Sequence, residues 1–346
     1  MTMTPLTTDD IYVLNFCAKY LARSRGGNSE AWRFPLIDSY SEKPGEPASV
    51  ELNAVTFVFD GRGRGIGNVS VIGTFSSVQE PVPLKPVKFL DEDTGFFAAT
   101  MAVPTKRLYR YRFLVDGQSE LDAINPQRQR QDDGVMWSQF FTHYYAQPIT
   151  LQSWERALLA RLVTHVLPFR TKEGENFLKR HVHSIEEDAR DRLVPYAYRL
   201  DVSVGVVNFI DALLAREESF RLPDYRICLR QIDRILRARA PEVAPAMAGA
   251  DMYRELYEQM GSSGDSGGPP VPGWNYKEYE SPSYFLKILR RHTLTGAFAH
   301  PKYGGNAGAS AWAYLEERFR TPQGGTLFDW RRAIERPWGS SQEYLG

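Results

Sequence analysis

The sequence predicts an α+β protein with more than one domain: an antiparallel β-sandwich followed by an all-α region. Between Ser49 and about Phe141, apolar residues alternate with other residues, as in short strands divided by turns such as Asp116-Gly117. After Pro148 the apolar residues recur three and four positions apart, which is the period of amphipathic helices. The predicted parts are an N-terminal helix and linker at 1–48, the sandwich at 49–146 and the helical domain at 147–346.

Composition excludes several classes of function. The 42 basic and 42 acidic residues balance, so no nucleic-acid partner is expected. No run of about twenty apolar residues occurs, so no membrane span is predicted. Cys17 and Cys228 have no metal or haem spacing; both are interpreted as buried thiols, with a bridge between them left open.

The N-terminal segment predicts one helix and then a linker. Residues Thr8 to Ala22 carry an imperfect apolar stripe that ends before Gly26-Gly27. The polar stretch up to Pro47 is interpreted as linker, with Trp32, Phe34 and Leu36 as docking points on the same chain.

The clearest strand is 108–115, with aromatic residues on one face and arginine alternating with leucine on the other. This segment resembles the glycogen-binding domain of the AMP-activated kinase beta subunit and the N-terminal domain of isoamylase-type enzymes. The resemblance implies an immunoglobulin-like early-set sandwich. The residues that carry it are Gly73 to Ser77, Pro83-Leu84, Gly95 to Phe97, Tyr109 to Gly117, Asp122 and Asn125-Pro126.

Glucan-binding relatives stack sugar rings on two tryptophans, where this chain has Val78 and Ser119. The remaining candidates for glycan contact are Arg112 and Trp137. We therefore favour a structural or subunit-docking role for the sandwich, with glucan recruitment as the alternative function. The glycine-rich run Gly61 to Gly67 fails the dinucleotide fingerprint and joins two predicted strands, so it is interpreted as a connector.

The C-terminal region predicts a series of helices. Thr150 is the expected N-cap of the first, Pro168 ends it, and Gly261 to Gly273 is interpreted as a flexible loop. The predicted helical segments are 151–166, 177–189, 204–214, 225–236, 252–257 and 284–298. His181 and His183 lie two apart, so their rings are expected on different faces, His181 on the apolar one, and not as a metal pair.

The last long helix is followed by an unusual turn. Pro301 cannot continue a helix, Gly304-Gly305 allows left-handed or closely packed backbone, and an apolar pattern restarts at Trp312. The stretch from His300 to Asn306, with Trp312, resembles the hallmark of the gluconate 2-dehydrogenase subunit 3 family. The pairing of Leu193-Val194-Pro195 with Gly205 to Asp211 is similar to the same family.

The resemblance implies a non-catalytic small subunit of a bacterial FAD-dependent sugar or glycoside dehydrogenase of the glucose–methanol–choline (GMC) type. Its partner would hold the FAD, and an electron-transfer subunit is a further expected partner. This chain is expected to contain no catalytic, cofactor-binding or metal-binding residue. The partner-interface candidates are His300, Pro301, Tyr303, Gly304, Gly305, Asn306 and Trp312.

Two points are left with alternatives: the role of His300 and the cellular location of the protein. His300 is interpreted as a cap on the preceding helix, with a catalytic base in an independent enzyme as the other reading. The N-terminus shows no signal peptide, which predicts a cytoplasmic protein. The alternative is periplasmic, by co-export with a partner that carries a twin-arginine signal.

Overall fold

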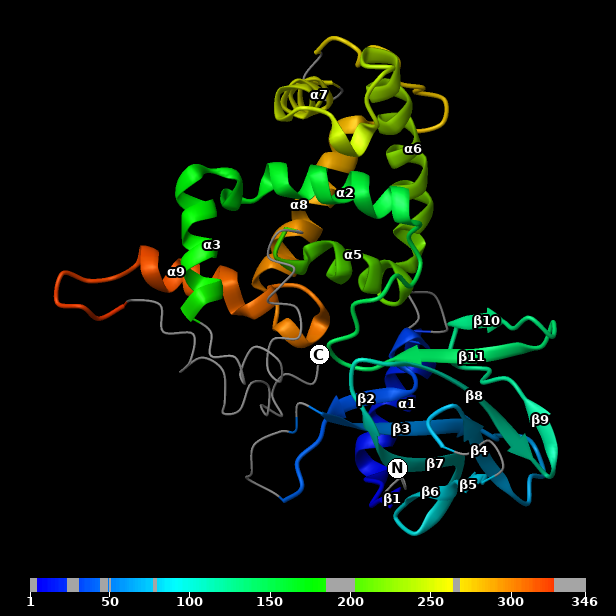
Figure 1. Ribbon diagram of the computed structural model, residues 1–346. Helices are drawn as coiled ribbons and strands as arrows, with labels where there is room; N and C mark the ends of the chain where they lie inside the picture. The colour runs from blue at the N-terminus through cyan, green and yellow to red at the C-terminus, as the bar shows by residue number, and fades with distance from the viewer. Residues whose placement is uncertain are drawn as a thin grey trace. The chain divides into compact units, whose positions relative to one another are not determined.

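The structure is a computed structural model that describes residues 5–23, 31–43, 49, 51–76, 80–184, 203–263 and 268–326. The chain divides into two compact units between Tyr145 and Ala146. The first unit is built mainly of strands and the second of helices (Figure 1). This confirms the α+β class. Within the described ranges, no helix is long and apolar enough to cross a bilayer.

The first unit contains two antiparallel sheets. Sheet A has the order β1-β7-β3-β2, with β6 also paired to β7; sheet B has the order β10-β11-β8-β4-β5, with β9 also paired to β8. The strands of sheet A are β1 (Pro5–Leu6), β2 (Leu36–Ser39), β3 (Leu52–Asp60), β6 (Lys85–Phe89) and β7 (Glu92–Pro104). Those of sheet B are β4 (Val69–Gly73), β5 (Val82–Pro83), β8 (Leu108–Val115), β9 (Gln118–Glu120), β10 (Arg128–Arg130) and β11 (Met136–Phe141).

The two sheets share one apolar core. Along β8 every second residue is buried, starting from Tyr109, and these side chains meet apolar residues of β3 and β7. The rings of Phe57 in β3 and Tyr111 in β8 lie edge to face at 5.0 Å. The predicted aromatic face of 108–115 is therefore the face that enters the core.

The other face of sheet A is covered by helix α1 (Asp10–Arg23), which confirms the predicted N-terminal helix. Val13, Phe16 and Cys17 of this helix form a second core with Val58 and Phe96 of the sheet, among others. Both faces of central β3 are thus buried. Successive side chains of β3 therefore point alternately into the core between the sheets and into the core beneath α1, and residues on both faces are buried.

The predicted linker before Pro47 is wrong at Leu36–Ser39, because this short segment is a strand. Strand β2 pairs with β3 in register, with Leu36 opposite Thr56 and Ile37 opposite Val55. Phe34 and Leu36 are buried, as expected of docking points, and Trp32 is half-buried. The glycine-rich run at 61–67 connects β3 to β4, as predicted.

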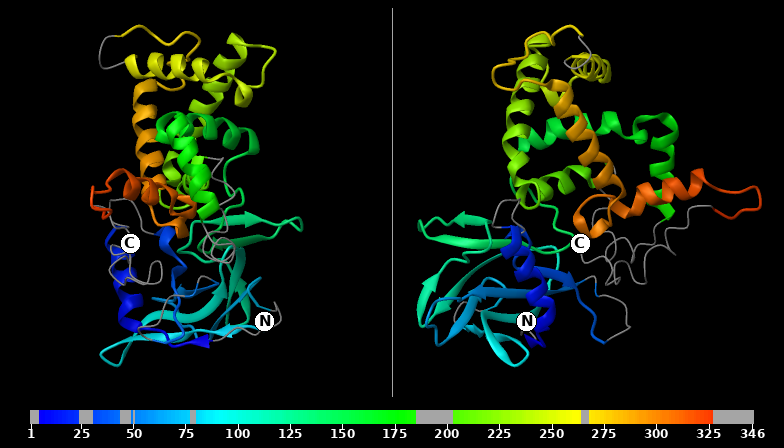
Figure 2. Two further views of the ribbon diagram at one scale, coloured as in Figure 1. Left: turned by 60° about the vertical axis from the view of Figure 1, so that its left-hand side comes forward. Right: turned by 180° about the vertical axis from the view of Figure 1, so that it is seen from behind.

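The second unit is an assembly of helices joined by short turns. The α-helices of its described part are α2 (Ser153–Val166), α3 (Lys172–Ser184), α5 (Val206–Ala215), α6 (Leu222–Arg239), α7 (Ala250–Ser262), α8 (Pro282–Phe298) and α9 (Ser310–Arg318). Helix α8, orange in Figures 1 and 2, runs from beside α7 to the turn that precedes α9. It contacts α2, α5, α6, α7 and α9, so it is central to this unit.

Two local predictions are wrong in detail, and a third falls on residues that the structure does not describe. The N-cap of α2 is Gln152, whose N–H donates to the Glu155 carboxylate in a capping box, and not Thr150, which lies two residues before it. The predicted loop from Gly261 begins inside α7, which ends at Ser262. The predicted continuation of α3 to 189 and the Leu193 to Pro195 segment lie outside the described residues.

Candidate functional site

The turn after α8 has the breaks that the sequence predicts. The helix begins at Pro282, two residues before the predicted start, because the Ser281 Oγ accepts a hydrogen bond from the Tyr284 N–H. It ends at Phe298. A 3₁₀ turn follows at Pro301–Tyr303, and Gly304 then takes a left-handed conformation with φ of 93°. A second 3₁₀ turn at Ala307–Ala309 leads into α9.

Asn306 ties the two ends of this turn together. Its side chain is fully buried and its φ is 46°, a left-handed conformation that asparagine tolerates better than most residues. The Nδ2 group donates to the Ala299 carbonyl at 3.0 Å, and the Oδ1 atom accepts from the Ala311 N–H at 2.9 Å. One side chain therefore links the end of α8 to the first turn of α9.

The described segments that carry the family resemblance, Gly205 to Asp211 and the turn after α8, pack against each other through glycines. A Cβ atom on Gly305 would lie 2.1 Å from the carbonyl oxygen of Gly296, and one on Gly296 would lie 2.6 Å from the ring of Phe209. A Cβ on Gly205 would lie 2.8 Å from the Gly304 carbonyl oxygen. These distances are too short for any side chain, so glycine permits the close approach of α5 to the end of α8.

His300 and Trp312 also serve the turn. The Trp312 Nε1 donates to the Phe298 carbonyl at 2.9 Å, and its ring meets the His300 ring edge to face at 5.9 Å. His300 Nδ1 accepts a hydrogen bond from the Lys302 N–H at 3.0 Å. The predicted cap on the preceding helix is therefore wrong: the chain turns away at Ala299, and His300 caps the following 3₁₀ turn.

Asp211, in the second family motif, anchors the start of the helical unit. Its carboxylate is 1 % exposed and accepts hydrogen bonds from the N–H groups of three successive residues, 149–151, at 2.8–3.0 Å. Arg156 of α2 donates to it at 2.7 Å and also to Asn208. Sequence reasoning missed this site, although an aspartate on the otherwise apolar helix α5 is a signal for a buried anion.

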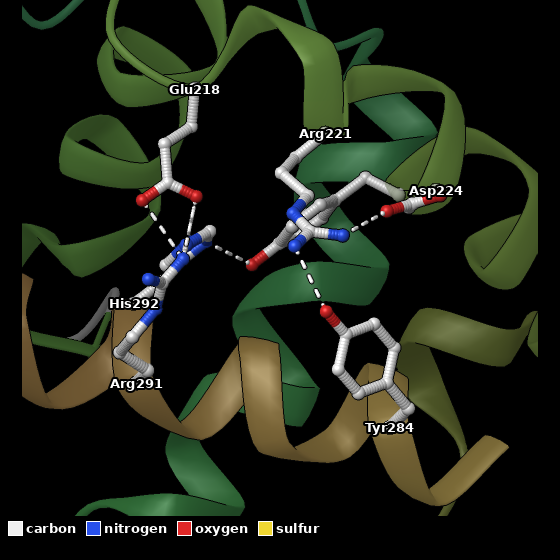
Figure 3. A network of polar contacts seen from close by, with 7 residues as sticks. Glu218, Arg221, Asp224, Tyr284, Arg291 and His292 are labelled. Carbon is white, nitrogen blue, oxygen red and sulfur yellow. Dashed lines mark hydrogen bonds and ion pairs between the residues drawn. The ribbon is translucent and has the colours of Figure 1, made fainter. Parts of the chain in front are cut away.

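A second polar cluster lies where the segment before α6 meets α8 (Figure 3). His292 is 2 % exposed; its Nε2 is 3.0 Å from a Glu218 carboxylate oxygen and its Nδ1 is 2.9 Å from the Tyr225 hydroxyl. Arg291 pairs with Glu218 at 2.6 Å. Burial lowers the pKa of His292, opposed by Glu218, and burial raises the pKa of Tyr225 well above its usual range.

The order carboxylate, imidazole, hydroxyl is one that activates nucleophiles in enzymes. Here the Tyr225 hydroxyl keeps its proton, and the whole residue is buried without access for a substrate. Both ring nitrogens of His292 have partners: Nδ1 faces the Tyr225 hydroxyl, and Nε2 faces Glu218 and also the Arg291 guanidinium, 2.8 Å away. The cluster therefore holds helices together and is not suited to catalysis. The sequence signal for it was a histidine on the apolar face of the 284–298 helix.

The structure divides the predicted interface candidates by accessibility. Pro301, Gly304, Gly305 and Asn306 are buried within the unit, and so is Trp312. His300 is half-buried, and Tyr303 is 42 % exposed. The buried residues shape the turn. Leu294 and Phe298, in the α8 turns just before it, are each 37 % exposed.

The other predicted candidates lie apart from this turn or have intrachain partners. His181 lies on the packed side of α3, as predicted; its ring stacks on Phe177, and its Nε2 is 2.8 Å from the Gly308 carbonyl. In the first unit, Arg112 donates to the carbonyls of Met136 and Ser119. Trp137 is half-buried on β11. Within the described ranges, no three His, Cys, Asp or Glu residues are grouped as for a metal.

In the helical unit, the residues of the two motifs that the structure describes are thus engaged in packing and capping. Residues 183–316 match the family model described as gluconate 2-dehydrogenase subunit 3, which supports the resemblance predicted from the two motifs. The match spans α5 to α8 and the first part of α9, including the turn at Asn306.

No curated protein matches the chain in sequence. Among solved structures, the enterochelin esterase from Shigella flexneri matches 28 % of this chain at 16 % identity, with a TM-score of 0.24. The enterobactin esterase from the same organism, in the presence of 2,3-di-hydroxy-N-benzoyl-serine, matches 33 % at 17 % identity and a TM-score of 0.25. The chain spans about a third of the length of these proteins, 32 % and 34 %. Likenesses at this level carry no argument about its activity.

Proposed function

We propose that this chain is a non-catalytic accessory subunit of a bacterial FAD-dependent sugar dehydrogenase of the GMC type. The observation that carries the proposal is that the turn motif and the described part of the second motif, Gly205 to Asp211, pack closely against each other. Gly205, Gly296 and Gly305 bring them into contact, and the family match covers all three positions. A gluconate 2-dehydrogenase subunit 3 is by its description part of a dehydrogenase, so the expected partner is the catalytic flavoprotein.

The side chains at the turn favour a structural role over a chemical one. His300 Nδ1 accepts from a backbone N–H, the Asn306 amide is bonded at both ends, and the Trp312 Nε1 is bonded to a carbonyl. A general base needs its acceptor atom available to the substrate proton. We therefore place FAD and the catalytic base in the partner, and assign to this chain the stabilisation of the flavoprotein and the shaping of access to its substrate.

Three finer points belong to the same proposal. The first unit is an early-set sandwich of the immunoglobulin-like type that extends the subunit interface. An electron-transfer subunit completes the complex. The chain resides in the cytoplasm, or is carried to the periplasm by a partner with a twin-arginine signal. Nothing specific favours glucan recruitment, because the Arg112 guanidinium is hydrogen-bonded within its own sheet.

Co-expression with each GMC-type flavoprotein encoded in the same genome tests the proposal. We expect the flavoprotein to be more soluble, to retain more flavin and to co-purify with this chain in fixed ratio. The His300→Ala variant tests the alternative of a catalytic base in this chain: with the base in the partner, turnover per flavin of the assembled complex should stay near the wild-type value. A flavoprotein that is equally soluble, flavin-loaded and active without this chain would refute the accessory role. Sugar oxidation by the isolated chain, lost in His300→Ala, would instead support an enzyme.

A further inference from the structure

One face of α8 is exposed along the length of the helix. Its residues are Tyr284, Lys287, Arg290, Arg291, Leu294 and Phe298, which we call the α8 face. Their spacing of three, four and seven places them on one side of a helix. Tyr284 is 44 % exposed, and Leu294 and Phe298 are each 37 % exposed. Tyr284 and Phe298 are separated by about 21 Å along the helix axis at 1.5 Å per residue.

The charge of this face has one sign. Helix α8 contains no aspartate or glutamate. Arg291 is compensated by Glu218, which lies 2.6 Å away. Arg290 is exposed and has no ion-pair partner in the part of the chain that the structure describes. A surface that combines exposed apolar side chains with cations favours a ligand that is apolar and acidic.

A pocket of about 470 Å³ lies on one flank of the face, where the ends of α2 and α7 meet α8. Its lining includes His165 and Tyr257, whose rings lie 4.6 Å apart, and Lys287, Arg290 and Leu294 of α8. The Tyr257 hydroxyl donates to the Leu162 carbonyl, so the ring is fixed in place. Burial, with Arg170 and Arg254, lowers the pKa of His165, so this wall is neutral near pH 7.

The face is held rigid before any partner binds. Phe285, Leu289 and Ala297, on the opposite side of α8, are completely buried. Ser281 caps the start of the helix, and Asn306 fixes the turn at its end. A surface already in its final conformation loses little conformational entropy on binding, which favours association.

We infer that the α8 face is the docking surface for the catalytic flavoprotein, and that it receives an apolar side chain beside a carboxylate. The apolar side chain enters the pocket next to Leu294, and the carboxylate pairs with Arg290. This inference rests on the proposed accessory role. A protein segment fits better than a small molecule, because the exposed apolar residues extend for about 21 Å, well beyond the pocket.

Binding of purified FAD dehydrogenase to variants of the full chain tests the inference. Arg290→Glu and Leu294→Asp should each raise the Kd by about tenfold or more, because one reverses the pairing charge and the other places a charge at the pocket. The matched controls are Arg230→Glu on α6 and Met247→Asp, both at exposed positions outside the face, which should change the Kd by less than about twofold. Unchanged thermal unfolding of all four variants would show that folding is intact.

A photo-crosslinker at position 294 supplies the second measurement. It should label a flavoprotein segment that contains an acidic residue, and reversing that residue to arginine should restore binding of Arg290→Glu. If the wild-type chain binds the flavoprotein and all four variants bind equally, the accessory role stands and this docking surface is wrong. If the wild-type chain does not bind, both proposals fail. Binding of octanoate in the pocket, with complex formation unaffected, would assign the pocket to a small carboxylate and overturn the inference.

Discussion

Replacing Asn306 by alanine tests how the turn after α8 is held. The change removes the donor to the Ala299 carbonyl and the acceptor for the Ala311 N–H, both in a buried environment. A buried backbone group left without its partner costs about 1–3 kcal/mol. The left-handed φ of 46° adds about 1 kcal/mol for alanine. We expect Asn306→Ala to lower the free energy of unfolding by about 4 kcal/mol, mostly from the lost hydrogen bonds.

Asn306→Gly separates these two contributions. Glycine adopts the left-handed conformation without strain but restores neither hydrogen bond, so this variant should be about 1 kcal/mol more stable than Asn306→Ala and still far below wild type. Urea unfolding of the full chain, followed by far-ultraviolet circular dichroism, measures the helical unit, and equal m-values would show that the unfolded state is unchanged.

The reasoning would be refuted if Asn306→Ala lost less than about 1 kcal/mol, since the two bonds would then contribute almost nothing. It would also be refuted if Asn306→Gly recovered the full wild-type stability. Backbone conformation alone would then explain the asparagine, and the side-chain link between α8 and α9 would be incidental.

Three further predictions concern the same unit. Gly305→Ala should lose about 3 kcal/mol or more in urea unfolding, because its Cβ meets backbone at 2.1 Å, whereas Gly249→Ala, with open space around it, should stay within about 1 kcal/mol of wild type. Asp211→Ala should lose about 3–5 kcal/mol by calorimetry, because it removes the buried carboxylate that pairs with Arg156 and accepts from three N–H groups; a loss below about 1 kcal/mol would contradict the anchor role. Burial lowers the pKa of His292, so as pH falls through the ordinary value of 6.5 the unfolded chain takes up a proton that the folded chain does not. Stability should therefore fall in that window, and His292→Gln should show a smaller pH dependence; an unchanged slope would be the contrary result.

The spacing of the apolar residues predicted most helices and the principal strands. Each of these elements buries one side against a core, so its apolar residues recur with the period of that element. It missed β2, where Leu36–Ser39 is too short and too polar to show alternation; pairing with β3 makes it a strand. The structure also shows why β3 is apolar on both sides: α1 covers the face that the second sheet does not.

The site was predicted in part. The breaks after Phe298, at Pro301 and at Gly304-Gly305, follow from the backbone restrictions of these residues and could be located from sequence alone. The approach of Gly205 to Gly304 joins residues that are distant along the chain, so no local pattern encodes it. The partners of Asn306 are near it in sequence, but they depend on the path that the chain takes through two 3₁₀ turns. His300 was assigned to the wrong turn because its cap depends on the direction that the chain takes at Ala299.

The proposed accessory role requires that this chain binds and stabilises a flavoprotein. The most direct test is the temperature at which the purified FAD dehydrogenase releases its flavin, measured by flavin fluorescence as the concentration of this chain is raised. A ligand that binds only the folded state stabilises it in proportion to RT ln(1 + [L]/Kd). We expect the release temperature to rise with the concentration of this chain. A release temperature that does not move at any concentration of the chain would contradict it.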